Sequence, residues 1–241
     1  MRRNYLLFCG IAASLLYIAM NIFIPFLDKG YNWVTQTVSE LSAIDAPTRP
    51  VWFVLGIIYT MLVVAFGWGV FKSAGEKQSL RIVGILMFLH GVLGITWSPM
   101  HQREVLATGG GTFTDIWHIV MSIITVLLMF LSIGFGAAAF GKAFRFYSIA
   151  TIFVFIVFGA LTFLEAPNVD KNGPTPFIGL WERINIAAFM IWLLVFSIML
   201  LRDRRSSLSI SYKKDMTGNK NISSKVSRPI VESKEFYLRE K

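Results

Sequence analysis

Charged residues and cysteine are both scarce in this sequence. Only 15% of its 241 residues are charged, whereas 55% are hydrophobic. Water-soluble globular domains carry about 25% charged residues, so this composition excludes that class of protein. The single cysteine, Cys9, excludes an intrachain disulfide.

Six long apolar runs account for most of the chain. A helix needs about 20 residues to cross a bilayer core of about 30 Å, and backbone groups in lipid must be hydrogen-bonded within the protein. None of the runs alternates in polarity as a membrane β-strand does. The predicted fold class is therefore all-α, a polytopic membrane protein with six transmembrane helices in a bundle. The runs cover approximately residues 5–27, 51–71, 82–99, 116–140, 147–164 and 176–201.

The first run resembles a signal peptide because Arg2 and Arg3 precede it. It is longer than a signal-peptide core and lacks a clear small-residue cleavage site. We therefore expect it to be retained as the first span.

Basic residues indicate how the spans are oriented. Lys and Arg bordering the spans on the N-terminal side outnumber those on the opposite side by about two to one, which predicts that both termini are cytoplasmic. The net charge of +9 then reflects topology, and no nucleic-acid partner is expected. The two sets are Arg2, Arg3, Lys72, Lys77, Arg81, Lys142, Arg145, Arg202, Arg204 and Arg205 on the N-terminal side, and Lys29, Arg49, Arg103, Lys171 and Arg183 on the other.

The composition changes after the sixth span. Residues 206–241 are rich in Ser, Lys and Asn and show no apolar period. We expect a six-span domain over residues 1–205 and a disordered, basic cytoplasmic tail over 206–241.

Acidic residues gather in the gaps predicted to face outward. These gaps, 28–50, 100–115 and 165–175, are longer than the inner ones and have room to build a site. The acidic residues on this side are Asp28, Glu40, Asp45, Glu104, Asp115, Glu165, Asp170 and Glu182.

The first outer gap contains a short amphipathic segment, Trp33 to Ala43, which predicts a helix at the membrane interface. Ser39 and Glu40 lie on its polar side. Two interpretations stay open, because these side chains either face water or turn inward toward a site.

His90 lies inside the third span, about nine residues before Pro99. At 1.5 Å per residue this is roughly 13 Å below the outer boundary. An ionisable group at that depth indicates a functional role, although a neutral imidazole can also pack and bond to a neighbouring helix.

Three residues around the second outer gap suggest a metal site. Antiparallel spans should bring His101 near Asp115 and His118, and two imidazoles with one carboxylate form a common zinc ligand set. A structural interpretation competes with this one, because Thr112 to Asp115 fits a capping box at the start of the fourth span.

Glu182 and Arg183 fall in the second turn of the sixth span. Adjacent helical residues point about 100° apart, so each needs a separate partner. We predict that Arg183 pairs with Glu40, Glu165 or Asp115 inside the mouth of the bundle, with snorkelling to water as the alternative.

Four segments at this face together resemble the bacterial and archaeal membrane family called domain of unknown function 998. The resemblance covers about residues 5–201 and implies a membrane location, in bacteria the cytoplasmic membrane, but no reaction. Members usually end soon after the sixth span, so the tail departs from the pattern. The segments are Ser39-Glu40-Leu41, Pro99-Met100-His101-Gln102-Arg103, Thr114-Asp115-Ile116-Trp117-His118 and Gly179-Leu180-Trp181-Glu182-Arg183-Ile184.

Three classes of function are compatible with these residues. In a metal-dependent, lipid-directed hydrolase the bound metal would activate water, Glu40 or Glu182 would act as general base, and Arg183 would hold an anionic head group. A fainter likeness to intramembrane hydrolases that combine Ser, Asp and His points the same way. The alternatives are a small-molecule transporter, which the shortage of charge within the spans disfavours, and a non-catalytic membrane module.

Overall fold

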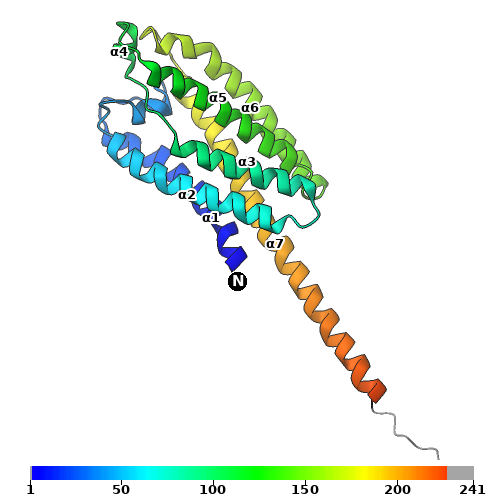
Figure 1. The fold of residues 1–241 in the computed structure, drawn as a ribbon. Helices are drawn as coiled ribbons and strands as arrows, with labels where there is room; N and C mark the ends of the chain where they lie inside the picture. The colour runs from blue at the N-terminus through cyan, green and yellow to red at the C-terminus, as the bar shows by residue number, and fades with distance from the viewer. Residues whose placement is uncertain (1, 227–241) are drawn as a thin grey trace, which may run out of the picture. The chain divides into compact units, whose positions relative to one another are not determined.

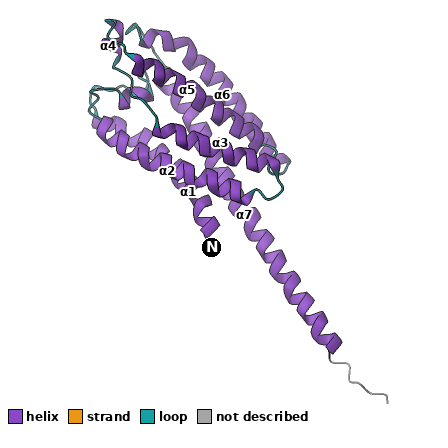
Figure 2. Ribbon diagram, in the orientation of Figure 1, coloured by secondary structure: helices purple, strands orange, loops and turns teal. Residues whose placement is uncertain are grey.

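The computed structural model describes the backbone of residues 2–226 and the side chains of residues 4–204. Nine helical segments make up the described chain, in which there is no strand (Figures 1 and 2). Six of these helices are long and apolar enough to cross a membrane, which confirms the predicted fold class. The spans are Asn4–Leu27, Arg49–Ser73, Gln78–Ile95, Phe113–Gly136, Lys142–Val169 and Ile178–Arg204.

The helical elements are α1 (Arg2–Phe23), η1 (Ile24–Leu27), η2 (Val38–Ser42), α2 (Arg49–Ser73), α3 (Gln78–Ile95), α4 (Arg103–Ala107), α5 (Phe113–Gly136), α6 (Lys142–Val169) and α7 (Ile178–Val226). The chain divides into two compact units, residues 1–200 and 201–241. In the second unit α7 continues as helical backbone to Val226, and residues 227–241 lie outside the described residues. The disordered tail predicted over 206–241 therefore stays a prediction.

The centre of the first unit is built around α7. Phe189, Trp192, Leu193 and Phe196 of this helix are completely buried. Trp192 stacks on Phe196 and donates its indole N–H to Ser148 Oγ of α6 at 3.0 Å. Many apolar side chains on the outside of the other spans remain exposed, as expected of a surface that lipid covers.

Helices α2 and α3 pack closely together, and glycines make the close approach possible. A Cβ on Gly84 would lie 2.5 Å from the backbone nitrogen of Phe71, and one on Gly67 would strike the backbone of Phe88. Small residues at such contacts let two membrane helices pack backbone against backbone. This packing fixes the position of the C-terminal end of α3 and of the segment that leads from it to α4.

The predicted amphipathic helix over residues 33–43 is wrong in extent, because only Val38–Ser42 is helical and has 3₁₀ geometry. The Asn32 side chain accepts hydrogen bonds from the backbone N–H groups of Val34 and Thr35, which makes a turn there. Such local side-chain bonds compete with helical ones. The turn sets the direction in which η2 enters the bundle.

The glycine contact yields a stability prediction. Gly84→Ala should lower the free energy of unfolding by about 1–3 kcal/mol, because the added methyl group meets backbone atoms that only a helix shift can move. Gly134→Ala is the matched control, since a Cβ there meets nothing within 4 Å. Equilibrium unfolding in mixed detergent micelles measures both, and equal effects would contradict the close packing of α2 and α3.

Candidate functional site

The polar residues singled out from the sequence gather at one end of the bundle, here called the loop end. It consists of η2, α4, the first two turns of α5 and α7, and the loops between them (Figure 1). Ser39, Glu40, His101, Asp115, His118, Glu182 and Arg183 lie there, whereas His90 lies deeper, in α3.

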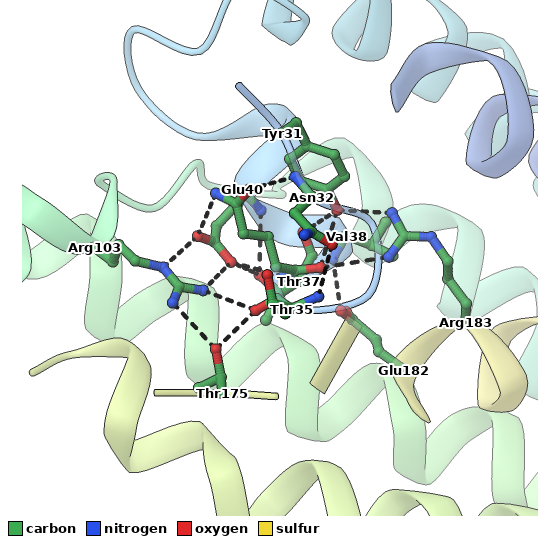
Figure 3. Close-up of polar contacts among 11 residues, drawn as sticks. Tyr31, Asn32, Thr35, Thr37, Val38, Glu40, Arg103, Thr175, Glu182 and Arg183 are labelled. Atoms are coloured by element: carbon green, nitrogen blue, oxygen red, sulfur yellow. Dashed lines mark hydrogen bonds and ion pairs between the residues drawn. The ribbon is translucent and has the colours of Figure 1, made fainter. Parts of the chain in front are cut away.

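A buried ion pair between Glu40 and Arg103 joins η2 to α4 (Figure 3). Arg103 Nε donates to Glu40 Oε1 at 2.7 Å, and a second guanidinium nitrogen donates to Oε2 at 2.8 Å. The two side chains are only 10% and 5% exposed. The hydrogen bonds to Glu40 raise the pKa of Arg103, so its charge is permanent.

The same two residues hold further segments together. Arg103 also donates to Thr175 Oγ1 at 3.1 Å, and that hydroxyl donates to the carbonyl of Thr35 at 2.7 Å. Glu40 Oε2 accepts from the backbone N–H of Thr37 at 2.7 Å, completing a capping box for η2. The lone pairs of Glu40 are therefore occupied by donors, which disfavours Glu40 as a general base.

Arg183 does not make the predicted ion pair. Its guanidinium donates to the carbonyls of Trp33 at 2.8 Å and Gly179 at 3.0 Å, and to the hydroxyl of Tyr31 at 2.7 Å. The prediction of a pair with Glu40, Glu165 or Asp115 is wrong because Arg103 occupies Glu40, while the turn after Tyr31 offers Arg183 free carbonyls. Burial raises the pKa of Tyr31, whose hydroxyl in turn donates to Thr37 O at 2.7 Å.

Glu182 contacts a different group from its neighbour, as predicted. Its Oε2 accepts from the backbone N–H of Val38 at 2.6 Å, at the first residue of η2 (Figure 3). Among the described residues this is its one hydrogen bond. Arg183 and Glu182 thus fix successive parts of the same loop, the turn and η2.

Ser39 and His118 form a hydrogen-bonded pair. Ser39 Oγ lies 2.9 Å from His118 Nε2, and His118 Nδ1 lies 2.6 Å from the carbonyl oxygen of Ser98. Trp97 packs edge-on against the imidazole, with ring centroids 4.8 Å apart. His118 is buried and Ser39 is half-buried, so Ser39 is the more accessible residue of the pair.

His101 and Asp115 lie together, as the antiparallel spans predict. The backbone N–H of His101 donates to Asp115 Oδ1 at 2.6 Å, and His101 Nδ1 lies 2.9 Å from Oδ2. The same carboxylate accepts from the Thr112 N–H at 2.7 Å, which confirms the predicted capping box. Asp115 therefore ties the α3–α5 connection to the first turn of α5.

The three predicted zinc ligands do not assemble into a metal site in this geometry. Both ring nitrogens of His118 are engaged by Ser39 and Ser98, and no group of three or more His, Cys, Asp or Glu among the described residues could hold a metal ion. A metal held by His101, Asp115 and His118 stays a prediction that would require these bonds to be exchanged.

His90 is buried beside α2 and α7. The hydroxyl of Tyr59 lies 3.2 Å from its Nε2, and the ring of Phe189 packs against it with centroids 6.0 Å apart. His90 therefore takes no direct part in the network at the loop end.

Two partners at this site were not identified from the sequence. In the sequence Arg103 is only a loop base and the last residue of the Pro-Met-His-Gln-Arg segment, and Ser98 has no distinguishing feature. The available signal for Arg103 was its position as a base in an outer gap, on the side where the acidic residues gather. Nothing in the sequence marks the Ser98 carbonyl, because every residue has the same backbone carbonyl group.

The ion pair gives a second stability prediction. Arg103→Met should lower the free energy of unfolding by about 3–5 kcal/mol, because the Glu40 carboxylate is left buried without its counter-charge. Lys171→Met removes a base from an exposed position at the same end and should change stability by less than about 0.5 kcal/mol. An Arg103 variant as stable as the Lys171 variant would show that the pair contributes little.

Comparison with known proteins supports the resemblance noted in the sequence. A search of curated proteins and a search of solved structures found no match. The model of one family, described as "Protein of unknown function (DUF998)", matches residues 11–199, which cover the four middle spans, most of the first and sixth spans, and every site residue above. The chain therefore belongs to the DUF998 family of multi-pass membrane proteins.

Proposed function

We propose that this protein is a membrane-embedded hydrolase that cleaves an ester bond of a lipid, with Ser39 as nucleophile and His118 as general base. The observation that carries the proposal is the 2.9 Å contact between Ser39 Oγ and His118 Nε2, combined with the 2.6 Å contact between His118 Nδ1 and Ser98 O. A nucleophile bonded to a base, and a base oriented by a third group, is the arrangement that activates serine in acyl transfer.

The Ser98 carbonyl determines the tautomer of His118. A carbonyl oxygen only accepts hydrogen bonds, so neutral His118 must carry its proton on Nδ1 and donate it to Ser98. Nε2 is then an acceptor, and the Ser39 hydroxyl donates to it. This is the protonation state in which Ser39 can pass its proton to the imidazole as it attacks.

The reaction can be written with these two residues. Ser39 Oγ attacks the ester carbonyl carbon while its proton moves to His118 Nε2. The imidazolium then protonates the leaving alkoxide, which releases an alcohol and leaves an acyl-serine. A water molecule then attacks the acyl carbonyl carbon as one of its protons moves to Nε2, and the imidazolium passes that proton to the departing Ser39 Oγ. This step releases a carboxylic acid and restores the serine. Asp115 lies three residues before His118 on the same face of α5.

A lipid substrate fits the position of Ser39 at one end of the apolar spans. Trp33 and Trp117 at the same end are partly exposed, and tryptophan is enriched at the head-group level of membranes. A lipid ester linkage lies at this depth. We further propose that the loop end faces outward from a bacterial cytoplasmic membrane, which rests on the distribution of basic residues and on the family resemblance.

The geometry favours this serine-based version over the metal-dependent version. The nitrogen atoms that a metal would need on His118 are already bonded, whereas the Ser39–His118 pair needs no rearrangement. The transporter and the non-catalytic module are the remaining alternatives, and neither makes use of an activated serine.

A fluorophosphonate probe tests the proposal without knowledge of the substrate, because it reacts with serine hydroxyls activated by a base. The purified full-length protein should be labelled on Ser39, as determined by mass spectrometry of the labelled peptide. Ser39→Ala should abolish labelling, and His118→Gln should slow it about 100-fold or more, since the base is lost.

Ser122→Ala is the matched control. The Ser122 hydroxyl bonds to the carbonyl of His118 within the same helix, one turn from the imidazole, so its loss should leave the labelling rate unchanged. Failure of the folded protein to label, or equal labelling of the Ser39→Ala variant, would rule out the serine hydrolase. Stoichiometric zinc in an unlabelled preparation would instead support the metal-dependent version.

A further inference from the structure

Four buried polar atoms among the described residues have no hydrogen-bond partner. They are Asn21 Oδ1, His90 Nδ1, Arg183 Nε and Asn185 Oδ1. Unsatisfied buried polar groups are rare in native proteins, and ordered water is the usual partner where the protein supplies none. All four belong to helices of the bundle, so each bears on what fills its interior.

Two of these atoms, in Asn21 and His90, are connected by a chain of contacts through the interior. Asn21 donates to the carbonyl of Tyr17, and the ring of Tyr17 lies 4.5 Å from that of Tyr59. The Tyr59 hydroxyl contacts His90, whose ring in turn packs on Phe189, one helical turn beyond Asn185. Helices α1, α2 and α3 thus each contribute a polar side chain to one seam, and α7 contributes Phe189, with Asn185 one turn closer to the loop end.

Glu182 lies at the loop end of this seam. It is one turn before Asn185 and Ile186, and Ile186 packs in the same cluster as Tyr17. Its carboxylate receives a single hydrogen bond from the described residues, although the residue is mostly shielded from solvent. A carboxylate needs more than one donor when it leaves bulk water, so water is expected around its second oxygen.

The seam ends near His90. Among the described side chains, the buried hydroxyls of Ser14, Ser132 and Ser197 lie on the same helices or their neighbours, and each donates to the carbonyl four residues earlier in its own helix. These hydroxyls are hydrogen-bonded within their own helices, so none of them needs a water molecule as partner. The polar path is therefore confined to the region between Glu182 and His90.

From this arrangement we propose that the interior of the bundle holds a water-filled half-channel, which runs from Glu182 at the loop end to His90 and is closed beyond it. A short chain of ordered water molecules fills the half-channel. These waters bond to Glu182, Asn185, Asn21 and His90 Nδ1. The half-channel brings water to the depth of His90 from the loop end alone. It does not depend on the chemistry proposed for Ser39.

Cysteine reactivity tests the half-channel directly. Asn185→Cys is introduced into the full-length Cys9→Ser protein in lipid nanodiscs and treated at pH 8 with methyl methanethiosulfonate, a small reagent that reacts with thiolate. A thiol ionises only where water reaches it. Modification at position 185, followed by mass spectrometry of the intact protein, should be about tenfold or more faster than at a lipid-facing position.

Phe153→Cys in the same background is the lipid-facing control, because Phe153 of α6 is 67% exposed on the apolar surface. Asn21→Cys tests the seam from the side of α1, and it should react as fast as Asn185→Cys. If Asn185→Cys fails to fold, the rate at position 21 decides the outcome. Rates at the seam no faster than at position 153 would show that the interior is dry and would overturn the proposal.

Discussion

The Glu40–Arg103 ion pair is the contact on which the arrangement of the loop end depends. It joins residues 63 positions apart in the chain, and through Thr175 it reaches the connection between α6 and α7. Removing two charges from water costs several kcal/mol each, and only the bidentate geometry with its additional donors offsets that cost. Ser39 immediately precedes Glu40, so the position of its hydroxyl beside His118 follows from this pair.

The polar residues of the loop end divide into two groups. Glu40, Asp115 and Arg183 each bond to several groups of the protein, and these bonds hold η2, α4 and the helix starts in place. Ser39 and Glu182 are only partly buried, and deeper in the bundle His90 retains an unpartnered nitrogen. The first group forms a rigid support, while the second offers positions for a substrate or water. Preorganised support around a few open groups is what a binding or catalytic site requires.

Much of the fold was predictable because lipid imposes a simple rule of length and apolarity on each span. The contact of His101 with Asp115 was predictable too, since a short connection between antiparallel helices brings their ends together. The pairing of Glu40 with Arg103 rather than Arg183 was not, because three loops converge there and sequence does not rank their contacts. Ser39 and His118 were both candidates, but their contact spans 79 residues and was expected of neither.

A double-mutant cycle on Glu40→Gln and Arg103→Met tests most directly whether this ion pair holds the loop end together. The free energy of unfolding of the wild type, both single variants and the double variant gives the coupling between the two side chains. A buried, bidentate pair predicts a coupling of about 1.5 kcal/mol or more, with the double variant less destabilised than the sum of the single variants. Strictly additive effects, with a coupling near zero, would contradict it.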